Sequence, residues 1–246
     1  MKQETLNLLI QLNREFYDVY AKSFSSTRYE IQPGIRRLLP GLLQSENLLD
    51  LGCGNGSLAK ALLEENYAGR YLGVDNSASL LNDAVAVIPE GKKDQFSFRQ
   101  IDLSAETHAN TIQPGFDAIV CFAVIQHFPV DPYLHRFFEF AAENLNDAGR
   151  FYPSTWQVKH NLRLSSRIQP WLVVGLDQQE LSEEDLLLDW RAEPALPPRY
   201  RYVHHYDSDS LRQAGQKTGL QLVKEFYSDG KEGDLALYQV WEKSVD

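Results

Sequence analysis

The sequence has few cysteines and fewer basic than acidic residues. Only Cys53 and Cys121 occur among its 246 residues, which excludes a disulfide framework, and no Cys-x-x-Cys or His-x-x-x-His pair predicts a metal site. The 24 Lys and Arg residues against 34 Asp and Glu residues give a formal net charge of −10. Because phosphate contacts need a basic face, this charge argues against a general nucleic-acid-binding protein, and we expect no DNA partner. A local basic patch is still compatible with it.

Long apolar runs are absent as well. No run reaches the roughly 18 residues that cross a bilayer, and the opening MKQETLNLLIQLNREF has no apolar core followed by a small-residue cleavage site. We therefore expect a cytoplasmic protein with no membrane partner. Hydrophobic residues make up 43% of the chain and include 12 Phe, 12 Tyr and 4 Trp, which is enough for the core of one large domain or of one domain with an insertion.

From residue 47 onward, short apolar runs alternate with helical patterns. Strands are expected at 47–51, 71–75, 96–101, 116–124 and 150–156, and helices at 5–24, 57–66, 78–87, 132–146 and 207–220. A final pair of strands, 221–229 and 234–243, predicts an antiparallel hairpin. The alternation predicts an α/β fold, a parallel sheet with helices on both faces. Pro153 lies inside the fifth strand, which we expect to bulge or end early because proline cannot donate to a ladder.

The stretch LLDLGCGNGSL (48–58) places three glycines between a strand and a helix. Such a turn either connects the two elements tightly or holds a ligand against its backbone. Counted from Gly54, GNGSLA matches the G-x-G-x-x-A spacing of dinucleotide-binding turns, and Asp75 lies 19 residues after the third glycine, near the place of a ribose-binding acid. Asp50 argues against a pyrophosphate, because its carboxylate would face the anion. A carboxylate there stabilises the sulfonium and ammonium groups of S-adenosylmethionine, so Asp50 favours this cofactor.

Two further acids follow the next strands. Asp75 ends the second strand, where it can accept hydrogen bonds from two ribose hydroxyls. Asp102 ends the third strand, where its carboxylate can accept a hydrogen bond from the adenine amino group. The backbone N–H of Leu103 can donate a hydrogen bond to the same base. Each acid alone could be a helix cap or a solvated loop residue, and Asp102 alone would favour that interpretation. Three acids at the carboxyl ends of successive strands are typical of a ligand that crosses the switch point of an open sheet.

The motifs DLGCGNG (50–56), GVDNS (73–77), IDL (101–103) and FDAIVCFAVIQH (116–127) resemble the successive motifs of class I S-adenosylmethionine-dependent methyltransferases. The resemblance covers about residues 45–156, and the helix and hairpin at the end fit the same fold. It implies a Rossmann-like, seven-stranded, mostly parallel sheet with an antiparallel last strand, and S-adenosyl-L-methionine as cofactor. It implies cofactor roles for Asp50, Gly52, Gly54, Gly56, Asp75 and Asp102. The candidate cofactor contacts from the same motifs also include Cys53, Asn76, Leu103 and Cys121.

The chain is expected to divide into a helical cap over 1–44 and a methyltransferase domain over 45–246. Within the domain, about fifty residues between the fifth strand and the late helix show no clear sheet pattern. Connections that long inside a domain are usually functional, so we predict a substrate-side insertion at about 157–206.

A narrower resemblance concerns the substrate. FYDVYAKSFSSTRY (16–29) looks like the opening of the tRNA wobble-uridine carboxymethyl methyltransferases, and RYRYVHHYDSDSL (199–211) is similar to that family's stretch before a late helix. EIQPG replaces the Trp and Pro that usually follow Thr-Arg, and DAGR replaces the usual double glycine before the fifth strand. A basic rim that could suit tRNA consists of Lys159, Arg163, Arg167, Arg199 and Arg201.

Four side chains outside the glycine turn are candidates for roles at the reaction centre. Tyr17 and Tyr20 lie one helical turn apart and either fold over the sulfonium by cation–π contact or pack in the core. Arg28 either holds the cofactor carboxylate or lies on the surface. His127 follows the fourth strand at the rim and is either a general base or orienting group, or a structural cap.

The identity of the methyl acceptor separates the functional alternatives. An acceptor carboxylate is already ionised at neutral pH and needs a cation, such as Arg199 or Arg201, with His204 as a further candidate. A hydroxyl or a protonated amine needs a base, for which His127 is the candidate. The best prediction is a tRNA wobble-uridine carboxylate, and the alternatives are a small-molecule O- or N-methyltransferase or a non-catalytic cofactor-binding subunit. A protein activator is a further possible partner.

Overall fold

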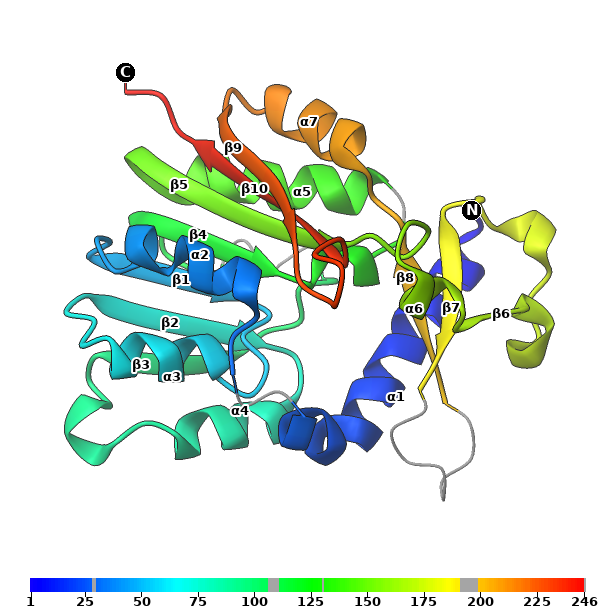
Figure 1. Cartoon of the computed structure of the whole chain (residues 1–246), viewed down its shortest axis with the longest axis horizontal. Coiled ribbons are helices and arrows are strands. Elements are labelled where there is room, and N and C mark those ends of the chain that lie inside the picture. Colours follow the sequence, from blue (N-terminus) through cyan, green and yellow to red (C-terminus); the bar gives the residue numbers. More distant parts are fainter. Residues whose placement is uncertain (28–29, 106–110, 130, 191–198, 246) are drawn as a thin grey trace.

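The computed structural model of the chain describes residues 1–27, 30–105, 111–129, 131–190 and 199–245, and it leaves the side chains of residues 20–27 and 131 undescribed. Two sheets organise these residues (Figure 1). The larger has seven strands in the order β3-β2-β1-β4-β5-β10-β9, and the smaller has three. The seven strands are β1 (Asn47–Leu51), β2 (Arg70–Asp75), β3 (Phe96–Gln100), β4 (Phe116–Phe122), β5 (Leu145–Trp156), β9 (Gln221–Ser228) and β10 (Ala236–Glu242).

The large sheet confirms the predicted Rossmann-like arrangement. β1, β2, β3, β4 and β5 pair in parallel, whereas β10 pairs antiparallel with both β5 and β9. Because parallel strands share a direction, the carboxyl ends of β1, β2, β3 and β4 lie along one edge. That edge carries the glycine turn and the acids predicted to bind the cofactor.

Helices cover both faces of this sheet. Successive side chains of a strand point to opposite faces, so each strand packs against helices on both sides. In β1, Leu48 packs in a core with α2 (Pro33–Leu42) and α3 (Ser57–Glu64), whereas Leu49 packs in a core with α5 (Asp131–Asn144) and α7 (Ser208–Gln216). A strand buried on both sides must be apolar on both sides, as the sequence pattern indicated. A further helix, α4 (Ala78–Ala86), packs against β2 and β3.

The predicted insertion has more sheet than expected. It contains the short helix α6 (Leu162–Ser165) and three antiparallel strands, β6 (Ile168–Gln169), β7 (Asp185–Asp189) and β8 (Tyr200–His204). β7 and β8 are short and almost wholly buried, so their residues do not alternate between apolar and polar as a half-exposed strand does. This explains why the sequence pattern did not reveal them.

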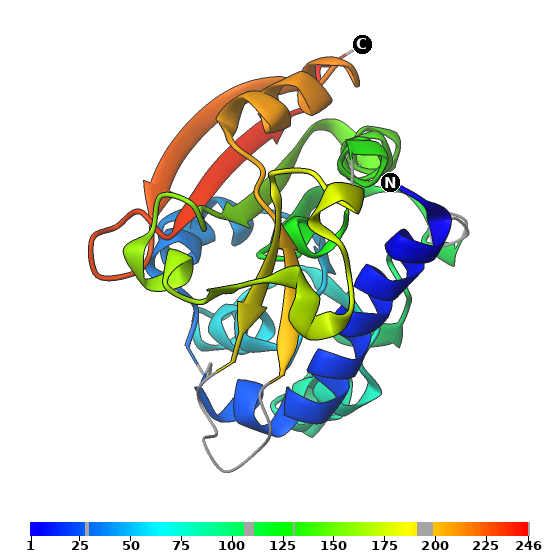
Figure 2. The same cartoon turned by 90° about the vertical axis from the view of Figure 1, so that its right-hand side faces the viewer.

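The two halves of the predicted N-terminal cap lie in different places. The long helix α1 (Gln3–Thr27) packs against β8 of the insertion and against α4, as Figure 2 shows from the side of the insertion. By contrast, the leucines of α2 belong to the core of the large sheet. The described helices include none that is long and apolar enough to span a membrane.

The expectation that Pro153 ends or bulges its strand is wrong. β5 continues to Trp156 and keeps one register with β10 on either side of the proline. The paired positions of these two strands skip Tyr152 and Pro153, so the missing N–H interrupts the ladder locally without ending the strand.

Candidate active site

The glycine turn joins β1 to α3 with backbone angles that suit glycine. Gly52, Gly54 and Gly56 have φ values of +78°, +56° and +77°. A Cβ at Gly52 would lie 2.3 Å from Cγ2 of Val124, so no larger residue fits without a shift. The N–H of Gly54 donates a 2.9 Å hydrogen bond to Oδ2 of Asp75, which joins the turn to the end of β2. The turn therefore presents backbone, without side chains, to the space beside it.

That space is a cavity of about 170 Å³, here called the first cavity, bounded by the glycine turn, the ends of β2, β3 and β4, and one face of α1. Seven of the predicted cofactor-binding residues line it together with the catalytic candidate His127. These seven are Tyr17, Gly52, Gly54, Asp75, Asn76, Asp102 and Leu103.

Two carboxylates give this cavity its chemical character. Asp75 accepts 2.9 Å hydrogen bonds from the N–H groups of Gly54 and Ser77. Burial raises the pKa of Asp75, and these hydrogen bonds oppose the increase. Asp102 accepts hydrogen bonds at Oδ1 from the N–H (2.9 Å) and the hydroxyl (2.6 Å) of Ser104, and it forms an ion pair at Oδ2 with Arg14. Carboxylates on the wall suit a ligand rich in hydrogen-bond donors and disfavour a pyrophosphate.

A larger space of about 430 Å³, here called the second cavity, continues from the first. The two share Gly52, Gly54, Phe122 and Ala123 in their linings. The predicted cofactor residues Asp50 and Cys53 and the predicted substrate residue Arg201 line the second cavity instead of the first, and so do Arg163 and Arg167 of the predicted basic rim. The carboxyl ends of β1 and β4 are therefore the boundary at which the two cavities meet.

Asp50 lies at the floor of this boundary. Its side chain is buried and accepts a 2.6 Å hydrogen bond at Oδ2 from the hydroxyl of Tyr71. Burial raises the pKa of Asp50 to about 7; the hydrogen bond from Tyr71 opposes this increase, and the negative charge of Asp75 adds to it. A cation placed beside Asp50 would favour its ionised form.

Arg201 of β8 forms part of the wall of the second cavity. Its side chain is only 2% exposed, and its guanidinium carbon lies 4.3 Å from the ring centre of Trp156. The rings of Phe16 and Trp190 lie at 5.3 and 5.5 Å from the same atom. These aromatic faces hold the guanidinium in one orientation.

Tyr17 and His127 form a hydrogen-bonded pair at the other end of the first cavity. The Tyr17 hydroxyl lies 2.7 Å from Nε2 of His127, and Nδ1 of His127 lies 3.2 Å from the carbonyl oxygen of Tyr202. Because a carbonyl only accepts, the hydrogen of the neutral imidazole is on Nδ1, and Nε2 accepts from Tyr17. His127 is thus not a simple cap but a partner of Tyr17.

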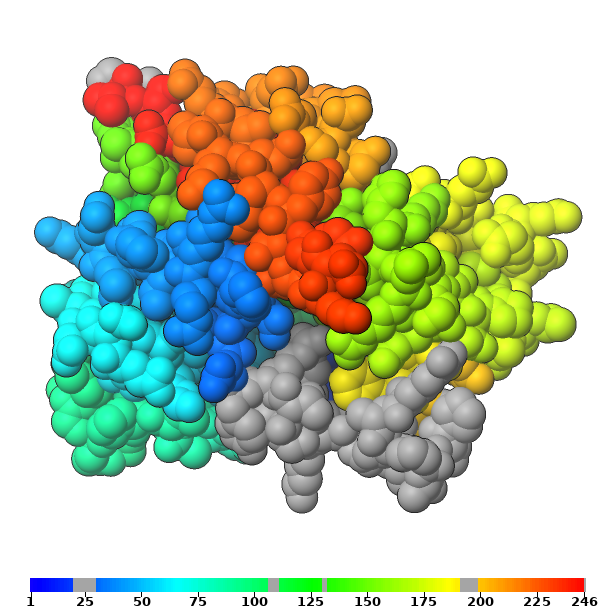
Figure 3. Space-filling view, viewed as in Figure 1, coloured from blue at the N-terminus to red at the C-terminus, as the bar shows by residue number. Residues whose placement is uncertain are grey.

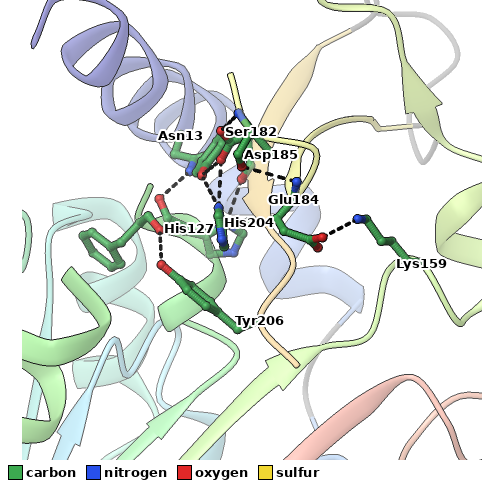
Figure 4. A network of polar contacts seen from close by, with 10 residues as sticks. Asn13, His127, Lys159, Ser182, Glu184, Asp185, His204 and Tyr206 are labelled. Atoms are coloured by element: carbon green, nitrogen blue, oxygen red, sulfur yellow. Dashed lines mark hydrogen bonds and ion pairs between the residues drawn. The ribbon is translucent and has the colours of Figure 1, made fainter. Parts of the chain in front are cut away.

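Asn13 anchors this pair to the insertion. Its amide nitrogen donates a 3.0 Å hydrogen bond to the carbonyl of His127, and its oxygen accepts one of 2.8 Å from the N–H of Tyr202. Figure 4 shows Asn13 of α1 beside His127, with Tyr206 close by. The hydroxyl of Tyr206 donates to the carbonyl of Phe128, the residue after His127.

The structure does not bring all predicted residues to the cavities. Cys121 is fully buried in the core under α5, because the alternation of β4 directs it away from the cavities, and its predicted cofactor contact is corrected here. Gly56 caps α3, where a Cβ would lie 2.9 Å from that of Ala84; it shapes the turn but lines neither cavity. Arg28 lies outside the described residues.

Two predicted substrate residues also lie elsewhere. Arg199 is exposed directly before β8 and is absent from the described linings of both cavities. His204 is buried, with Nδ1 2.8 Å from Oδ1 of Asp185, and these two side chains point toward each other in Figure 4. Oδ1 of Asp185 also accepts a 2.6 Å hydrogen bond from the Tyr202 hydroxyl. This placement makes His204 part of the packing of the insertion and corrects its predicted contact with the acceptor.

Several lining residues were not predicted. Asn13 and Arg14 share a helical face with Tyr17, so the 3.6-residue period of α1 could have indicated them. Tyr71, the partner of Asp50, was not predicted either; it lies in the core of the large sheet and lines neither cavity, so it carried no comparable signal. The remaining unpredicted aromatic lining of the second cavity comprises Phe122, Trp156, Trp190 and Tyr238.

Comparison with known proteins identifies the family. The family model described as "Methyltransferase domain" matches residues 24–225, which is most of the chain. The chain belongs to this methyltransferase family. Its cofactor is S-adenosyl-L-methionine, which the acidic residues that line the two cavities also favour.

Two curated relatives match part of the chain. A ubiquinone biosynthesis O-methyltransferase from Alkalilimnicola ehrlichii is 33% identical over 92 residues, which cover 37% of this chain and 35% of that protein. One of the same name from Paracidovorax citrulli is 30% identical over 106 residues, covering 42% of each. The chain therefore aligns with well under half of the length of these relatives.

Solved structures share the fold. A S-adenosylmethionine-dependent methyltransferase from Methanosarcina mazei superposes with a TM-score of 0.64 at 16% identity, covering 88% of this chain and all of that one. A putative methyltransferase from Haloferax volcanii, solved with the Trm112 methyltransferase activator, gives 0.63 at 17% identity over 95% of this chain and 98% of that one. At these identities the likeness extends to the fold alone.

The residues that line the two cavities fit the methyl donor. The first cavity offers carboxylate oxygens of Asp75 and Asp102 to hydroxyl and amino donors, and the turn between the cavities is open backbone. Asp50, at that turn, can pair with a cation. This arrangement of donors and acceptors suits the nucleoside part of the cofactor in the first cavity and its cationic methionine part beside Asp50.

Proposed function

We propose that this domain methylates a carboxylate of its acceptor, and that Arg201 orients that carboxylate in the second cavity. The observation that supports this proposal is the buried guanidinium of Arg201 over Trp156, in a cavity that begins at the glycine turn. An arginine fork matches a carboxylate with two parallel hydrogen bonds, and it remains charged at every pH of interest.

When bound, S-adenosylmethionine supplies a methyl group on a positively charged sulfur. A carboxylate needs no base to react with it, so the protein contributes alignment and exclusion of water. Arg201 holds the acceptor oxygen in line, Asp50 orients the cationic methionine group, and the aromatic side chains around Arg201 exclude water. The bond from sulfur to methyl breaks as the bond from oxygen to methyl forms, and no proton moves.

More specifically, the proposed methyl acceptor is a wobble-uridine carboxylate in tRNA. It is supported by the resemblance of residues 16–29 and 199–211 and by the arginines at the second cavity. The Haloferax volcanii neighbour was solved with a methyltransferase activator, and an activating subunit is part of this proposal.

A second candidate is methylation of a hydroxyl on a small molecule. The Tyr17–His127 pair supports it, because Nε2 of His127 can receive a proton passed through the Tyr17 hydroxyl. The printed names of the curated relatives, ubiquinone biosynthesis O-methyltransferases, are compatible with such an acceptor.

Methyl transfer from labelled cofactor to bulk tRNA and to a small-metabolite extract separates these candidates. A methyl ester releases volatile methanol in mild alkali, whereas an ether does not, so the chemistry of the product is read directly. We expect alkali-labile label, lost at least tenfold in Arg201→Gln and largely kept in His127→Asn. Alkali-stable label, lost in His127→Asn, would instead establish the hydroxyl acceptor.

Cofactor affinity is the control for both variants. Unchanged affinity for S-adenosylhomocysteine shows that each variant is folded, and Arg201→Lys tests whether charge alone suffices. If the protein binds the cofactor but transfers no methyl group to any acceptor in cell extract, it is not a catalyst. It would then be a non-catalytic cofactor-binding subunit.

A further inference from the structure

A buried carboxylate on the wall of the second cavity has no part in the proposed methyl transfer. Asp229 begins the turn between β9 and β10, and only 3% of it is exposed. It accepts a 2.8 Å hydrogen bond at Oδ1 from the N–H of Gly34 and one of 2.5 Å at Oδ2 from the hydroxyl of Tyr238. In Figure 3 this turn lies between the segments of α2 and α6, on the face viewed in Figure 1. Asp229 therefore joins the turn to the start of α2 beside the cavity.

The carboxylate of Asp229 can accept a further hydrogen bond. A carboxylate has about four lone-pair sites, and only two donors are in place here. Both donors are neutral, and no cationic side chain of the described residues forms an ion pair with Asp229. Buried carboxylates are stabilised by pairing and hydrogen bonding. Asp229 therefore favours a hydrogen-bond donor in the adjoining cavity.

Packing fixes the position of Tyr238 and, through it, that of Asp229. The Tyr238 ring stacks on Phe226 with the ring centres 5.2 Å apart. A Cβ at Gly34 would lie 2.2 Å from Cε2 of Tyr238, so only glycine lets the start of α2 come this close to the ring. The carboxylate of Asp229 is thus held between α2 and β10.

The pairing of β5 with β10 relates Asp229 to Arg201. Ser154 and Trp156 line the second cavity from one face of β5, two positions and therefore roughly 7 Å apart. Tyr238, the hydrogen-bond partner of Asp229, lies opposite Ser154, whereas Arg201 lies over the ring of Trp156. One wall of the cavity therefore has a cation near one of these positions and a hydrogen-bond acceptor near the other.

We infer that Asp229 determines acceptor specificity by accepting a hydrogen bond from an N–H group of the acceptor, while Arg201 binds the acceptor carboxylate. The inference rests on the proposed function for the carboxylate and adds the second group. Phe122 and Trp156 line the same cavity, and aromatic side chains pack well against a flat ring. The acceptor is thus a ring that carries an acid and an N–H donor. A site built to bind an N–H group discriminates against an analogue that lacks it.

Two small probes that differ in the N–H donor test the inference. Uracil-5-acetate and phenylacetate both carry a flat ring and a carboxylate, but only the first has ring N–H groups. Each probe is titrated calorimetrically into the protein saturated with S-adenosylhomocysteine. We expect uracil-5-acetate to bind about tenfold more tightly than phenylacetate, or better. Equal affinities, or no binding of uracil-5-acetate, would overturn the inference.

The variant Asp229→Asn removes the carboxylate with little change to the turn. Its amide oxygen can still accept from Gly34, and asparagine tolerates the φ of +72° at this position. We expect the preference for uracil-5-acetate to be lost and the affinity for phenylacetate to be unchanged. Asp117→Asn is the matched control, because Asp117 also accepts from two backbone N–H groups but is absent from the described linings of both cavities. Equal losses for both probes in Asp229→Asn would assign Asp229 a structural role only and contradict the inference.

Tyr238→Phe is a second variant, which removes a donor to Asp229 but keeps the ring that packs on Phe226. The carboxylate remains, so the preference should remain; its loss would assign the contact to the Tyr238 hydroxyl and overturn the inference. Arg201→Gln tests the proposed function separately, because it should weaken both probes and leave the ratio of their affinities unchanged. If Arg201→Gln binds both probes normally, the proposed role of Arg201 is wrong, whereas that of Asp229 still depends on the affinity ratio.

Discussion

Tyr71 of β2 donates a hydrogen bond of 2.6 Å to Asp50 of β1, directly beneath the glycine turn. The two residues are buried, and the ring of Tyr71 packs against Phe96 and Phe98 of β3. This packing fixes the position of the Tyr71 hydroxyl. The hydrogen bond in turn fixes the carboxylate of Asp50 relative to the cavities. A fixed carboxylate at this position selects a cationic ligand group over a phosphate.

Removing this hydrogen bond should weaken cofactor binding more than it weakens the fold. In Tyr71→Phe the ring packing remains, but the ionised form of Asp50 loses a stabilising donor. We expect about tenfold weaker binding of S-adenosylmethionine at neutral pH, corresponding to roughly 1.4 kcal/mol. Calorimetric titration measures the affinity. Tyr67→Phe is a control, because Tyr67 hydrogen-bonds to Ser45 away from the cavities; equal losses in the two variants would contradict the prediction.

Cofactor affinity should depend on pH through Asp50. Its pKa is about 7 in the unliganded protein, so below this value a bound cation must displace a proton. We expect the dissociation constant to fall as the pH rises from 5.5 to 7, approaching about tenfold per unit below the pKa. Asp50→Asn should bind weakly and show a flatter profile. A profile of the same slope in Asp50→Asn would assign the proton to another group.

The carboxyl group of Asp50 should make the unliganded protein less stable as the pH rises. The unfolded chain releases the proton of Asp50 near its ordinary pKa of 3.8, whereas the folded protein keeps it until about pH 7. The raised pKa of Asp50 therefore stabilises the folded protein at low pH, and this stabilisation is lost as the pH rises from 3.8 to about 7. Asp75, whose pKa burial also raises, acts in the same direction. Denaturant titrations at pH 5 and 7 should show the loss, and saturating cofactor should reduce it.

Arg14 should compete with the cofactor for Asp102. The two side chains are 46% and 31% exposed, so their ion pair is worth at most about 1 kcal/mol. Arg14→Gln frees the carboxylate for an amino group of the ligand, and we expect up to about fivefold tighter binding of S-adenosylmethionine and a weaker dependence on salt. Lys2→Gln, which breaks an ion pair with Glu180, is the control. Weaker binding by Arg14→Gln would mean that Arg14 contacts the cofactor itself.

Asn13→Ala should destabilise the protein by about 2 kcal/mol. The change leaves the carbonyl of His127 and the N–H of Tyr202, both in buried residues, without their amide partner. Denaturant unfolding measures the effect. Asn7→Ala is the control, because Asn7 is exposed on the same helix and only accepts from Gln3. A loss below 0.5 kcal/mol would show that water replaces the amide.

The main sheet and the cofactor side of the site follow from local patterns in the sequence. The glycine turn, Asp75 and Asp102 are each placed by a strand end, and parallel strands bring their ends to one edge without any further information. The prediction about Cys121 failed because residues alternate between the two faces of β4, and a continuous apolar run does not reveal which face a given position takes.

The acceptor side could not be predicted in the same way. Trp190 and Arg201 reach the second cavity through a small sheet whose buried strands show no alternation, and Arg163 lies on a four-residue helix. Their association depends on pairing between distant segments, which no local period encodes. Arg199 and Arg201 are two positions apart in the sequence, yet one is exposed and the other is buried.

The link between Asn13 and Tyr202 spans 189 positions of the chain. Chains that depend on contacts between distant segments fold more slowly than chains rich in local contacts, so we expect this contact to form late in folding. The first cavity, whose wall includes α1, is therefore complete only after both the start of the chain and β8 have folded. Cofactor binding during refolding would then report the last assembly step, and a refolding intermediate with an intact large sheet would still fail to retain S-adenosylmethionine.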